Sequence, residues 1–439
     1  MSERAARNGG RAGVAALVAI LLLGLGLRGC EAWDGRPPVY DAQGYADIAI
    51  ELERGNGFAL GPGATQPATN YSPGLPLFVS GLYALTGGVH ERTARLVLAL
   101  LGALAVLFSY LIGRRLSGPL AGLVGGAAVA IYPALLEYQG MLMSEPLAAT
   151  LLSGAVLAML WADQGRDQGV GARVLPARYW LAPGLVLGAL ALVRPEYLAI
   201  SFPIAVVIFA RRGRDGWREG LGQALIMLGG LAIVVVPWTV RNEVALGRFV
   251  PISTGGGQVL FAGSYMPSGG NPEDVGAEVL QRHPELRPEL PRDPRLEQIL
   301  AALAHQRYPD TEADAALARM GRERLWDDVS ERPVEYAGFL ARKLWLIWGH
   351  GPRRVMHAPG WAVLHWLLLG LGLLGLAALA YRRRWEAVLL GTVLLAATAI
   401  GLLLVASPRR ALVTLPLLAA LAGTGATFVA DSLARRWKR

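Results

Sequence analysis

Long apolar segments alternate with short polar ones along most of the chain. A helix needs about 20 apolar residues to cross the hydrocarbon core of a bilayer. Ten segments approach or reach that length, and two of them, 179–193 and 196–211, are short. The pattern predicts an all-α polytopic membrane protein with about ten transmembrane helices. The candidate spans are residues 13–29, 92–113, 118–136, 145–163, 179–193, 196–211, 219–240, 359–381, 385–406 and 409–430.

Two polar regions interrupt the apolar pattern. Residues 30–91 follow the first span and contain an amphipathic segment that begins near Asp41, together with the apolar stretch 73–88, which is marginal in length for a span. Residues 241–358 contain the charged, proline-rich stretch 271–340, which predicts a small soluble region. We therefore expect three parts: a transmembrane module at 1–240 that includes the loop 30–91, the soluble region 241–358, and C-terminal transmembrane helices at 359–439.

Composition and charge support a membrane location and give the orientation. The chain has 439 residues, of which 53% are hydrophobic and 17% charged, where a soluble protein has about a quarter charged. The net charge is +9, and its basic residues gather at the ends of apolar runs. With ten spans, the clusters near Arg11, Arg114, Arg166 to Arg178, Arg211 and Arg382, and both chain ends, fall on one side, which we expect to be the cytoplasm. A basic stripe with interleaved aromatics is lacking, so nucleic acid is not an expected partner.

Unusual polar residues gather at the outer ends of the spans, and the middles of the spans carry almost no charge. An ion-coupled transporter is expected to keep charged groups near the midplane. Carboxylates and arginines at one membrane face instead suit an amphiphilic anionic substrate whose lipid tail stays in the bilayer. These outer residues are Asp41, Glu137, Glu145, Arg194, Glu196, Arg241, Arg409 and Arg410.

Each arginine in this set has two interpretations. A guanidinium at the interface can form paired hydrogen bonds with a phosphate, or it can simply extend towards water. Arg194 precedes Pro195, which ends the helix before it. Arg410 follows Pro408 at the start of a span. Because Arg194, Arg241, Arg409 and Arg410 share one face, we expect at least one of them to contact phosphate.

The carboxylates are equally open to two interpretations. Asp41 is either a general base that takes the proton of an attacking hydroxyl, or an acid that suits a helix N-terminus. Glu145 is either a metal ligand or polar wall of the site, or an acid that complements the helix after a Ser144 cap. Histidines give no pair with metal-ligand spacing, so a metal is not required, and Glu145 is the candidate ligand if one is present.

Six stretches, spaced along most of the chain, carry a resemblance to a known family. The sequence resembles the GT-C-type membrane glycosyltransferases that use polyprenyl-phosphate sugars, in the branch of protein O-mannosyltransferases and the lipid A aminoarabinose transferase. The segment 271–340 is outside the likeness. The stretches are D-A-Q-G-Y-A-D-I-A (41–49), Y-S-P-G-L-P-L-F (71–78), M-S-E-P-L (143–147), L-V-R-P-E (192–196), P-W-T-V-R-N-E-V-A-L-G-R-F-V-P-I-S-T-G-G-G (237–257) and S-P-R-R-A-L-V-T-L-P (407–416).

The resemblance implies a first extracytoplasmic loop that bears a catalytic aspartate, and Asp41 matches that position. Family members often carry a second acid directly after it, where this chain has Ala42. Some members carry Lys or Arg just before the prolines of 71–78, where this chain has Asn70 and Tyr71, so the phosphate contact is expected at Arg194, Arg241 or the Arg409-Arg410 pair. Tyr71 and Glu196 are further candidate residues of the donor site. Tyr45 is expected to shape the sugar pocket.

The sequence therefore predicts an inverting glycosyltransferase in a bacterial-type cytoplasmic (inner) membrane. It would move a sugar from a polyprenyl-phosphate donor to a hydroxyl of a protein, lipid or glycan acceptor at the outer face, with no cofactor required and a divalent metal left open. Two alternatives remain. A flippase or transporter for lipid-linked sugars would need a polar path across the midplane, and a non-catalytic scaffold would use residues 241–358 to bind a partner.

Overall fold

The computed structural model describes residues 3–64, 67–163 and 177–437. The secondary structure of these residues is helical, apart from one isolated bridge between Ala59 and Pro67. The basic residues Arg166 and Arg173 of one predicted cytoplasmic loop lie outside the described residues. The chain divides into two compact units, which we describe separately. The first comprises Met1–Ile252, Arg353–Leu394 and Leu412–Arg439, and the second comprises Ser253–Pro352 and Leu395–Ala411.

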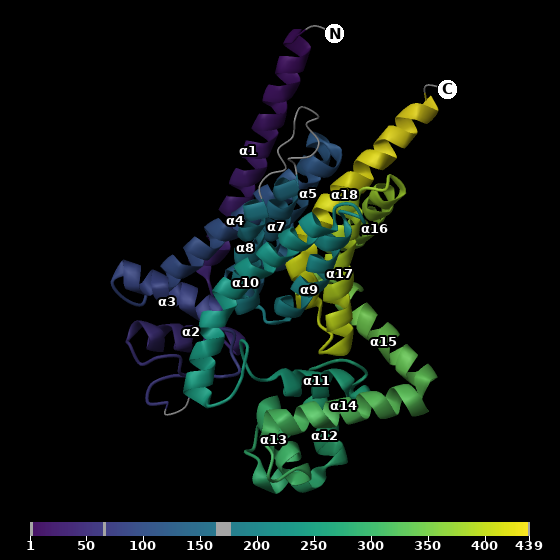
Figure 1. Ribbon diagram of the computed structural model, residues 1–439. Coiled ribbons are helices and arrows are strands. Elements are labelled where there is room, and N and C mark those ends of the chain that lie inside the picture. The colour runs from purple at the N-terminus through teal and green to yellow at the C-terminus, as the bar shows by residue number, and fades with distance from the viewer. Residues whose placement is uncertain (1–2, 65–66, 164–176, 438–439) are drawn as a thin grey trace. The chain divides into compact units, whose positions relative to one another are not determined.

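Most helices belong to the first unit, and two helices, α17 and α18, continue from one unit into the other (Figure 1). In chain order, the helices up to residue 246 are α1 (Glu3–Asp34), α2 (Asp41–Glu53), α3 (Gly74–Thr86), α4 (Glu91–Ser117), α5 (Pro119–Ile131), α6 (Pro133–Gln139), α7 (Ser144–Asp163), α8 (Leu181–Val193), α9 (Glu196–Ala210) and α10 (Trp217–Leu246). They are followed by α11 (Gly256–Ser264), α12 (Val275–Arg282), α13 (Leu296–Arg307), α14 (Ala313–Glu331), α15 (Pro333–Trp348), α16 (Pro359–Tyr381), α17 (Trp385–Leu403) and α18 (Pro408–Trp437).

Seven helices of the described residues are long and apolar enough to cross a membrane, or eight if the bent pair α5 and α6 is one span. The seven are most of α1, together with α4, α7, α10, α16, α17 and α18. The remaining predicted spans, at 179–193 and 196–211, correspond to the shorter helices α8 and α9. The prediction of a multi-pass helical membrane protein is confirmed, and the count of about ten stays a prediction.

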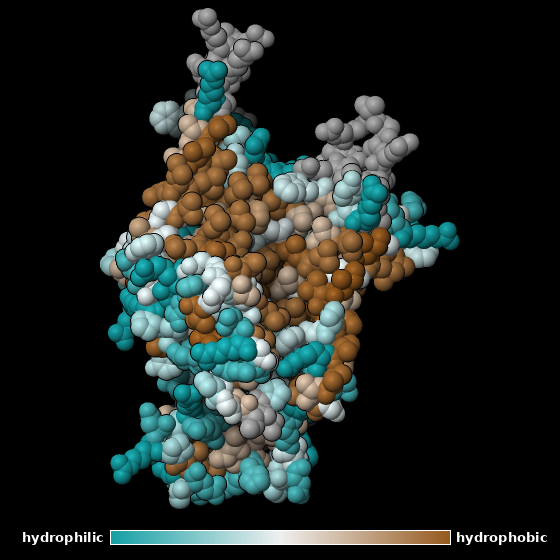
Figure 2. All heavy atoms as spheres, turned by 90° about the vertical axis from the view of Figure 1, so that its left-hand side faces the viewer, coloured by the Kyte–Doolittle hydropathy of each residue, from teal (hydrophilic) through white to brown (hydrophobic). Residues whose placement is uncertain are grey.

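Apolar side chains on the outside of α1 show why this fold suits lipid. Val14 and Leu22 are each more than half exposed. Figure 2 shows apolar side chains gathered over a broad area of the face that it presents. Exposed apolar area of this extent is unfavourable in water and costs nothing against acyl chains. The stretch 73–88, in contrast, contains only the 13-residue helix α3, which is too short to span.

The predicted span 118–136 is broken rather than continuous. It forms α5 and α6, which meet at an angle of 50°. Pro133 has no N–H to continue the helix, and Tyr132 before it is extended, with ψ of 113°. Carbonyls at the end of α5 are satisfied from α1, because Arg28 donates to Val129 O at 2.9 Å and to Ala130 O at 3.2 Å. A buried arginine near the break thus replaces the missing backbone bonds.

The two short helices of the loop 30–91 are attached to the membrane helices by close packing. α2 packs against α3, and α3 packs against α8 (Figure 1). A Cβ on Gly74 would lie 2.6 Å from Val193 Cγ2, so only a glycine permits this approach of α3 to the end of α8. Ile48 and Phe58 form a small buried cluster with Trp238 of α10 at its edge. These contacts fix the start of α2 near the end of α8.

The second unit has its own hydrophobic core. Phe261 and Tyr265 from the α11 segment pack with residues of α12, α13 and α14, such as Val279, Leu300 and Leu317. α11 lies so close to α14 that a Cβ on Gly257 would stand 1.8 Å from the Asp314 carbonyl oxygen. The segment between α10 and α16 is thus a folded helical region, and the two compact units separate at Ile252. The predicted soluble region 241–358 and its boundaries stay predictions.

Candidate functional site

Asp41 is the first residue of α2, and its side chain is exposed. Tyr40 before it has φ of 52°, a backbone conformation that residues other than glycine adopt rarely. Such strain is found more often at functional sites than elsewhere. A carboxylate at a helix N-terminus is also favoured by the helix dipole, so position alone leaves both interpretations of Asp41 open.

Tyr45 lies one turn after Asp41 and connects it to three other charged or polar groups. Its hydroxyl shares a hydrogen bond with Ser144 at the start of α7. Burial, together with the negative charges of Glu145 and Asp41, raises the pKa of Tyr45 to about 12, although Arg194 and the Ser144 hydrogen bond act in the opposite direction. The phenol therefore stays protonated at neutral pH and can donate a hydrogen bond. Asp41, Glu145 and Arg194 all lie within electrostatic reach of this one hydroxyl.

Arg194 lies in the short turn between α8 and α9. α8 ends at Val193 and α9 begins at Glu196, as the Arg-Pro-Glu sequence predicts. Its guanidinium donates to Glu196 Oε1 at 2.8 and 3.0 Å, to Glu145 Oε1 at 3.3 Å, and to Ser144 Oγ at 3.5 Å. Glu145 is fully buried, whereas the Arg194 side chain is 13% exposed. The site thus contains a fixed, nearly buried guanidinium whose outer edge reaches solvent.

Tyr71 forms the aromatic wall beside this cluster. Its ring meets that of Tyr45 edge-on, with centroids 5.4 Å apart. The ring also lies directly on Gly44, where an added Cβ would stand 2.3 Å from Tyr71 Cζ. Gly44 is therefore required for the two tyrosines to sit together. The structure brings the predicted residues Tyr45 and Tyr71 into contact, and no local sequence pattern indicates that pairing.

Arg241 belongs to the same unit but has different neighbours. Its guanidinium stacks on Trp238 at 4.9 Å and on Phe58 at 5.6 Å from the ring centroids. It also donates to Asn242 Oδ1 at 3.1 Å. Tyr71 packs at the edge of the cluster that contains Phe58 and Trp238. Arg241 and Tyr71 thus both pack against the cluster that contains Phe58 and Trp238. A role of Arg241 in phosphate binding stays a prediction.

Arg409 and Arg410 lie in the second unit, at the start of α18. Arg410 Nε donates to Val405 O at 2.9 Å, and the Arg409 N–H donates to Ser407 Oγ at 3.3 Å. These two hydrogen bonds fix the Ser-Pro-Arg-Arg turn. Nearby in this unit, Lys343 of α15 is buried and donates to carbonyls that include Gly263 O at 2.7 Å.

The predicted metal site receives little support from side-chain geometry. The described residues contain no group of three or more His, Cys, Asp or Glu side chains placed to hold a metal ion. The carboxylates of Glu145 and Glu196 both accept hydrogen bonds from Arg194, so the Arg194 guanidinium already balances their charge. Glu145 as a metal ligand stays a prediction.

Sequence reasoning missed two features of this region. Ser144 was expected only to cap α7, yet its hydroxyl meets both Tyr45 and Arg194. Arg353, with φ of 81°, forms an ion pair with Glu137 and stacks over Tyr138 at 5.6 Å. These partners are far apart in sequence, and no local pattern indicates such pairs.

Comparisons with known proteins agree with this architecture. Residues 69–239 match the family described as dolichyl-phosphate-mannose-protein mannosyltransferase. No curated protein matches the sequence. A crystal structure of the Archaeoglobus fulgidus oligosaccharyltransferase in complex with Zn and sulfate is 19% identical, with a TM-score of 0.58, over 96% of this chain and 50% of that one. The same archaeal enzyme, AglB, in complex with an inhibitory peptide and a dolichol-phosphate is 18% identical, with a TM-score of 0.58, over 97% and 51%.

A weaker likeness links the chain to ArnT from Cupriavidus metallidurans bound to undecaprenyl phosphate, with 19% identity and a TM-score of 0.44 over 92% of this chain and 77% of that one. The chain spans about half the length of the archaeal structures. At such identities the likeness establishes the fold. The prediction from sequence is confirmed at that level: the chain has the GT-C-type fold of polytopic membrane glycosyltransferases, and its segment 69–239 matches a mannosyltransferase family of that type.

Proposed function

We propose that the protein is an inverting glycosyltransferase that moves a sugar from a polyprenyl-phosphate donor to a hydroxyl acceptor. The reaction takes place at the outer face of a bacterial-type cytoplasmic membrane, and both chain termini lie in the cytoplasm. The observation that carries the proposal is that Asp41, Glu145 and Arg194 lie within electrostatic reach of the Tyr45 hydroxyl. These residues come from three segments of the GT-C-type fold: the start of α2, the start of α7 and the turn between α8 and α9. The matching family and the archaeal structure with bound dolichol-phosphate support a lipid-phosphate donor.

The proposed chemistry needs one base and one fixed cation. The acceptor oxygen attacks the anomeric carbon while its proton passes to the Asp41 carboxylate. The bond between the anomeric carbon and the phosphate oxygen breaks, and its electron pair leaves with the polyprenyl phosphate. Attack from the side opposite the leaving group inverts the anomeric configuration. A positioned base of this kind contributes about 10²–10⁴-fold in rate.

Arg194 is the chain's group for the departing phosphate. As the sugar leaves, negative charge grows on the phosphate oxygens, and a guanidinium that is already in place stabilises it without reorganising. Glu196 and Glu145 fix the Arg194 orientation. The Tyr45 hydroxyl, protonated at neutral pH, can donate to a sugar or phosphate oxygen beside Asp41. Arg241, Arg409 and Arg410 are proposed as further phosphate contacts.

The requirement for metal is open to a direct test. One archaeal relative was crystallised with Zn and sulfate. A divalent ion near Glu145 would shield developing negative charge, which is the chemistry that Arg194 already supplies. Transfer is therefore expected to continue after chelation with EDTA. Loss of transfer in EDTA and its return with a divalent cation would instead assign a metal to this site.

The purified protein in liposomes tests the function as a whole. The donor is a polyprenyl-phosphate sugar that carries a radiolabel in the sugar, offered with candidate protein, lipid and glycan acceptors. Release of polyprenyl phosphate and transfer of label support the proposal. Movement of intact donor between leaflets without consumption of the sugar would favour a flippase. Neither consumption nor movement, together with specific capture of a protein through residues 241–358, would favour a scaffold.

A further inference from the structure

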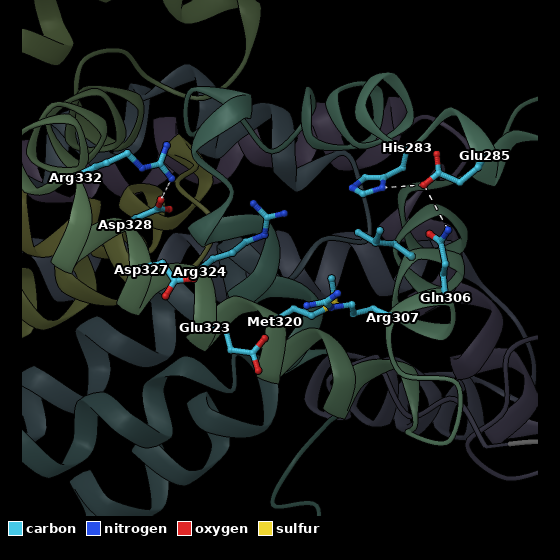
Figure 3. A pocket seen from close by; sticks show the side chains of 11 residues that line it. His283, Glu285, Gln306, Arg307, Met320, Glu323, Arg324, Asp327, Asp328 and Arg332 are labelled. Atoms are coloured by element: carbon cyan, nitrogen blue, oxygen red, sulfur yellow. Dashed lines mark hydrogen bonds and ion pairs between the residues drawn. The ribbon is translucent and has the colours of Figure 1, made fainter.

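A polar cavity lies in the second unit. It has a volume of about 580 Å³, and α13 and α14 supply most of its walls (Figure 3). A second cavity of about 520 Å³ adjoins it and shares Arg324, Asp328 and Arg332. We call the two together the α14 groove. Its charged lining residues include Glu323, Arg324, Asp327, Asp328, Arg332 and Arg342.

Arg324 lies where the two cavities join. Its guanidinium stacks on Tyr265 at 4.7 Å and on Phe261 at 5.4 Å from the ring centroids. The side chain is half-buried, yet it makes no hydrogen bond or ion pair with any residue that the structure describes. Figure 3 shows it between the Asp328–Arg332 pair on one side and His283 with Glu285 on the other. A half-buried guanidinium held by two rings is a fixed fork of donors.

The carboxylates close to Arg324 are directed to other groups. Asp328 pairs with Arg332, and Glu323 accepts hydrogen bonds from Arg319 at 2.9 Å and Tyr308 at 3.0 Å. Burial is the main reason that the pKa of Arg324 is lowered; Tyr265 and the Asp328 carboxylate act in the opposite direction but do not outweigh it, and Arg282 and Arg332 lower it further. A partly buried charge that lacks a directly bonded anion is unfavourable. An anionic ligand group would supply that anion.

The two ends of the groove differ in charge. The second cavity carries four arginines, at 282, 324, 332 and 342, against the carboxylates of Asp328 and Glu335. The first carries four carboxylates and three arginines, with Leu303 and Met320 as its apolar side chains. Carboxylates accept hydrogen bonds and need hydroxyl or amine donors. The ligand should therefore present an acidic group at one end and donors at the other.

We propose that the α14 groove binds an anionic saccharide, with its carboxylate or phosphate on Arg324 and its hydroxyls on the carboxylates of the first cavity. A saccharide fits because its hydroxyls satisfy acceptors and donors alike and need no deep apolar pocket. A peptide normally anchors apolar or aromatic side chains, and this groove offers few places for them. A strongly acidic chain would also be repelled by Glu323, Asp327 and Glu285.

Isothermal titration calorimetry with the full-length protein in detergent tests this inference. The carboxylate probe is a galacturonic acid trisaccharide, the phosphate probe is glucose 6-phosphate, and maltotriose is the neutral control. At least one acidic sugar should bind, and maltotriose should bind about tenfold more weakly or not at all, because one charge-assisted fork is worth that much. Comparison of the two acidic probes distinguishes a carboxylate from a phosphate ligand. Binding should weaken with added NaCl.

Arg324→Gln should weaken acidic-sugar binding about tenfold, and Arg324→Lys should recover only part of the loss. The matched control is Arg322→Gln, an exposed position on the same helix that does not line the groove. If Arg324→Gln fails to fold, Arg342→Gln at the exposed rim and the salt dependence of the wild type provide the test. Equal binding of maltotriose, an unchanged affinity in Arg324→Gln, or binding of an acidic peptide but no sugar would overturn the proposal. The titration needs no donor lipid, so its failure is distinct from failure of the proposed transferase activity.

Discussion

Removal of the Arg194 guanidinium should cost both stability and activity, and the two costs can be separated. In Arg194→Gln, the fully buried Glu145 loses the cation that donates to it at 3.3 Å. Removing one partner of a buried ion pair costs about 3–5 kcal/mol. Glu196 is 16% exposed and can turn towards water, so it adds less. We expect a loss of about 3 kcal/mol in the free energy of unfolding.

A second substitution should repair the stability but not the reaction. In the double variant Arg194→Gln with Glu145→Gln, no buried carboxylate remains at this point, and most of the lost stability should return. Transfer should stay reduced by about 10²–10³-fold, because the cation that stabilises the leaving phosphate is absent. Arg194→Lys, the conservative control, keeps the charge and should retain partial activity.

Thermal unfolding in detergent and donor consumption measure the two effects on the same preparations. A loss of about 3 kcal/mol corresponds to a decrease of roughly 6–12 °C in the melting temperature, at 2–4 °C per kcal/mol. The double variant should unfold within a few degrees of the wild type and still fail to consume donor. If the double variant regains transfer, Arg194 only neutralises Glu145, and its assigned contact with phosphate is wrong.

Three further predictions follow from single features. Gly44→Ala would place a Cβ 2.4 Å from the Tyr71 hydroxyl, so the ring must shift by about 1 Å, and transfer should fall about 10²-fold. In the control Gly81→Ala, the added Cβ would meet no atom within 4 Å, so the transfer rate should stay unchanged. Equal transfer rates in the two variants would contradict the role of Gly44. Burial lowers the pKa of Lys343 to about 7 from 10.5. Between pH 7 and 10.5 the unfolded chain therefore binds more protons at Lys343 than the folded chain does. The free energy of unfolding should rise with pH in this window, by up to about 1.4 kcal/mol per pH unit, and the rise should vanish in Lys343→Met. Transfer should persist in EDTA, and its loss would show that a metal is required.

The local features of the site could be predicted from sequence because they depend on neighbouring residues. The helix start at Asp41 and the helix end before Pro195 both agree with the structure. Each is a backbone effect of adjacent residues. The long apolar segments were equally clear, since their length alone separates them from soluble helices.

Other features depended on partners far away in the chain. The apolar run continues on both sides of Pro133, so hydropathy predicts one span at 118–136, although the proline itself signals the break that the structure shows. Its repair by Arg28, about 100 residues earlier, has no local signature. The same holds for Arg194, which meets Glu145 across 49 residues. Periodicity shows which residues face inwards, but it does not show which of them meet.

The most direct test of the central claim compares two aspartates of the same helix. Asp41 and Asp47 both belong to α2, and the Asp47 carboxylate already accepts a hydrogen bond from Gln43 at 2.6 Å. Initial rates of transfer from a labelled polyprenyl-phosphate sugar are measured for Asp41→Asn and Asp47→Asn at matched protein levels. We predict that Asp41→Asn lowers the rate by about 10²–10⁴-fold, whereas Asp47→Asn stays near the wild-type rate. Transfer by Asp41→Asn at a near wild-type rate would contradict the assignment of Asp41 as the base.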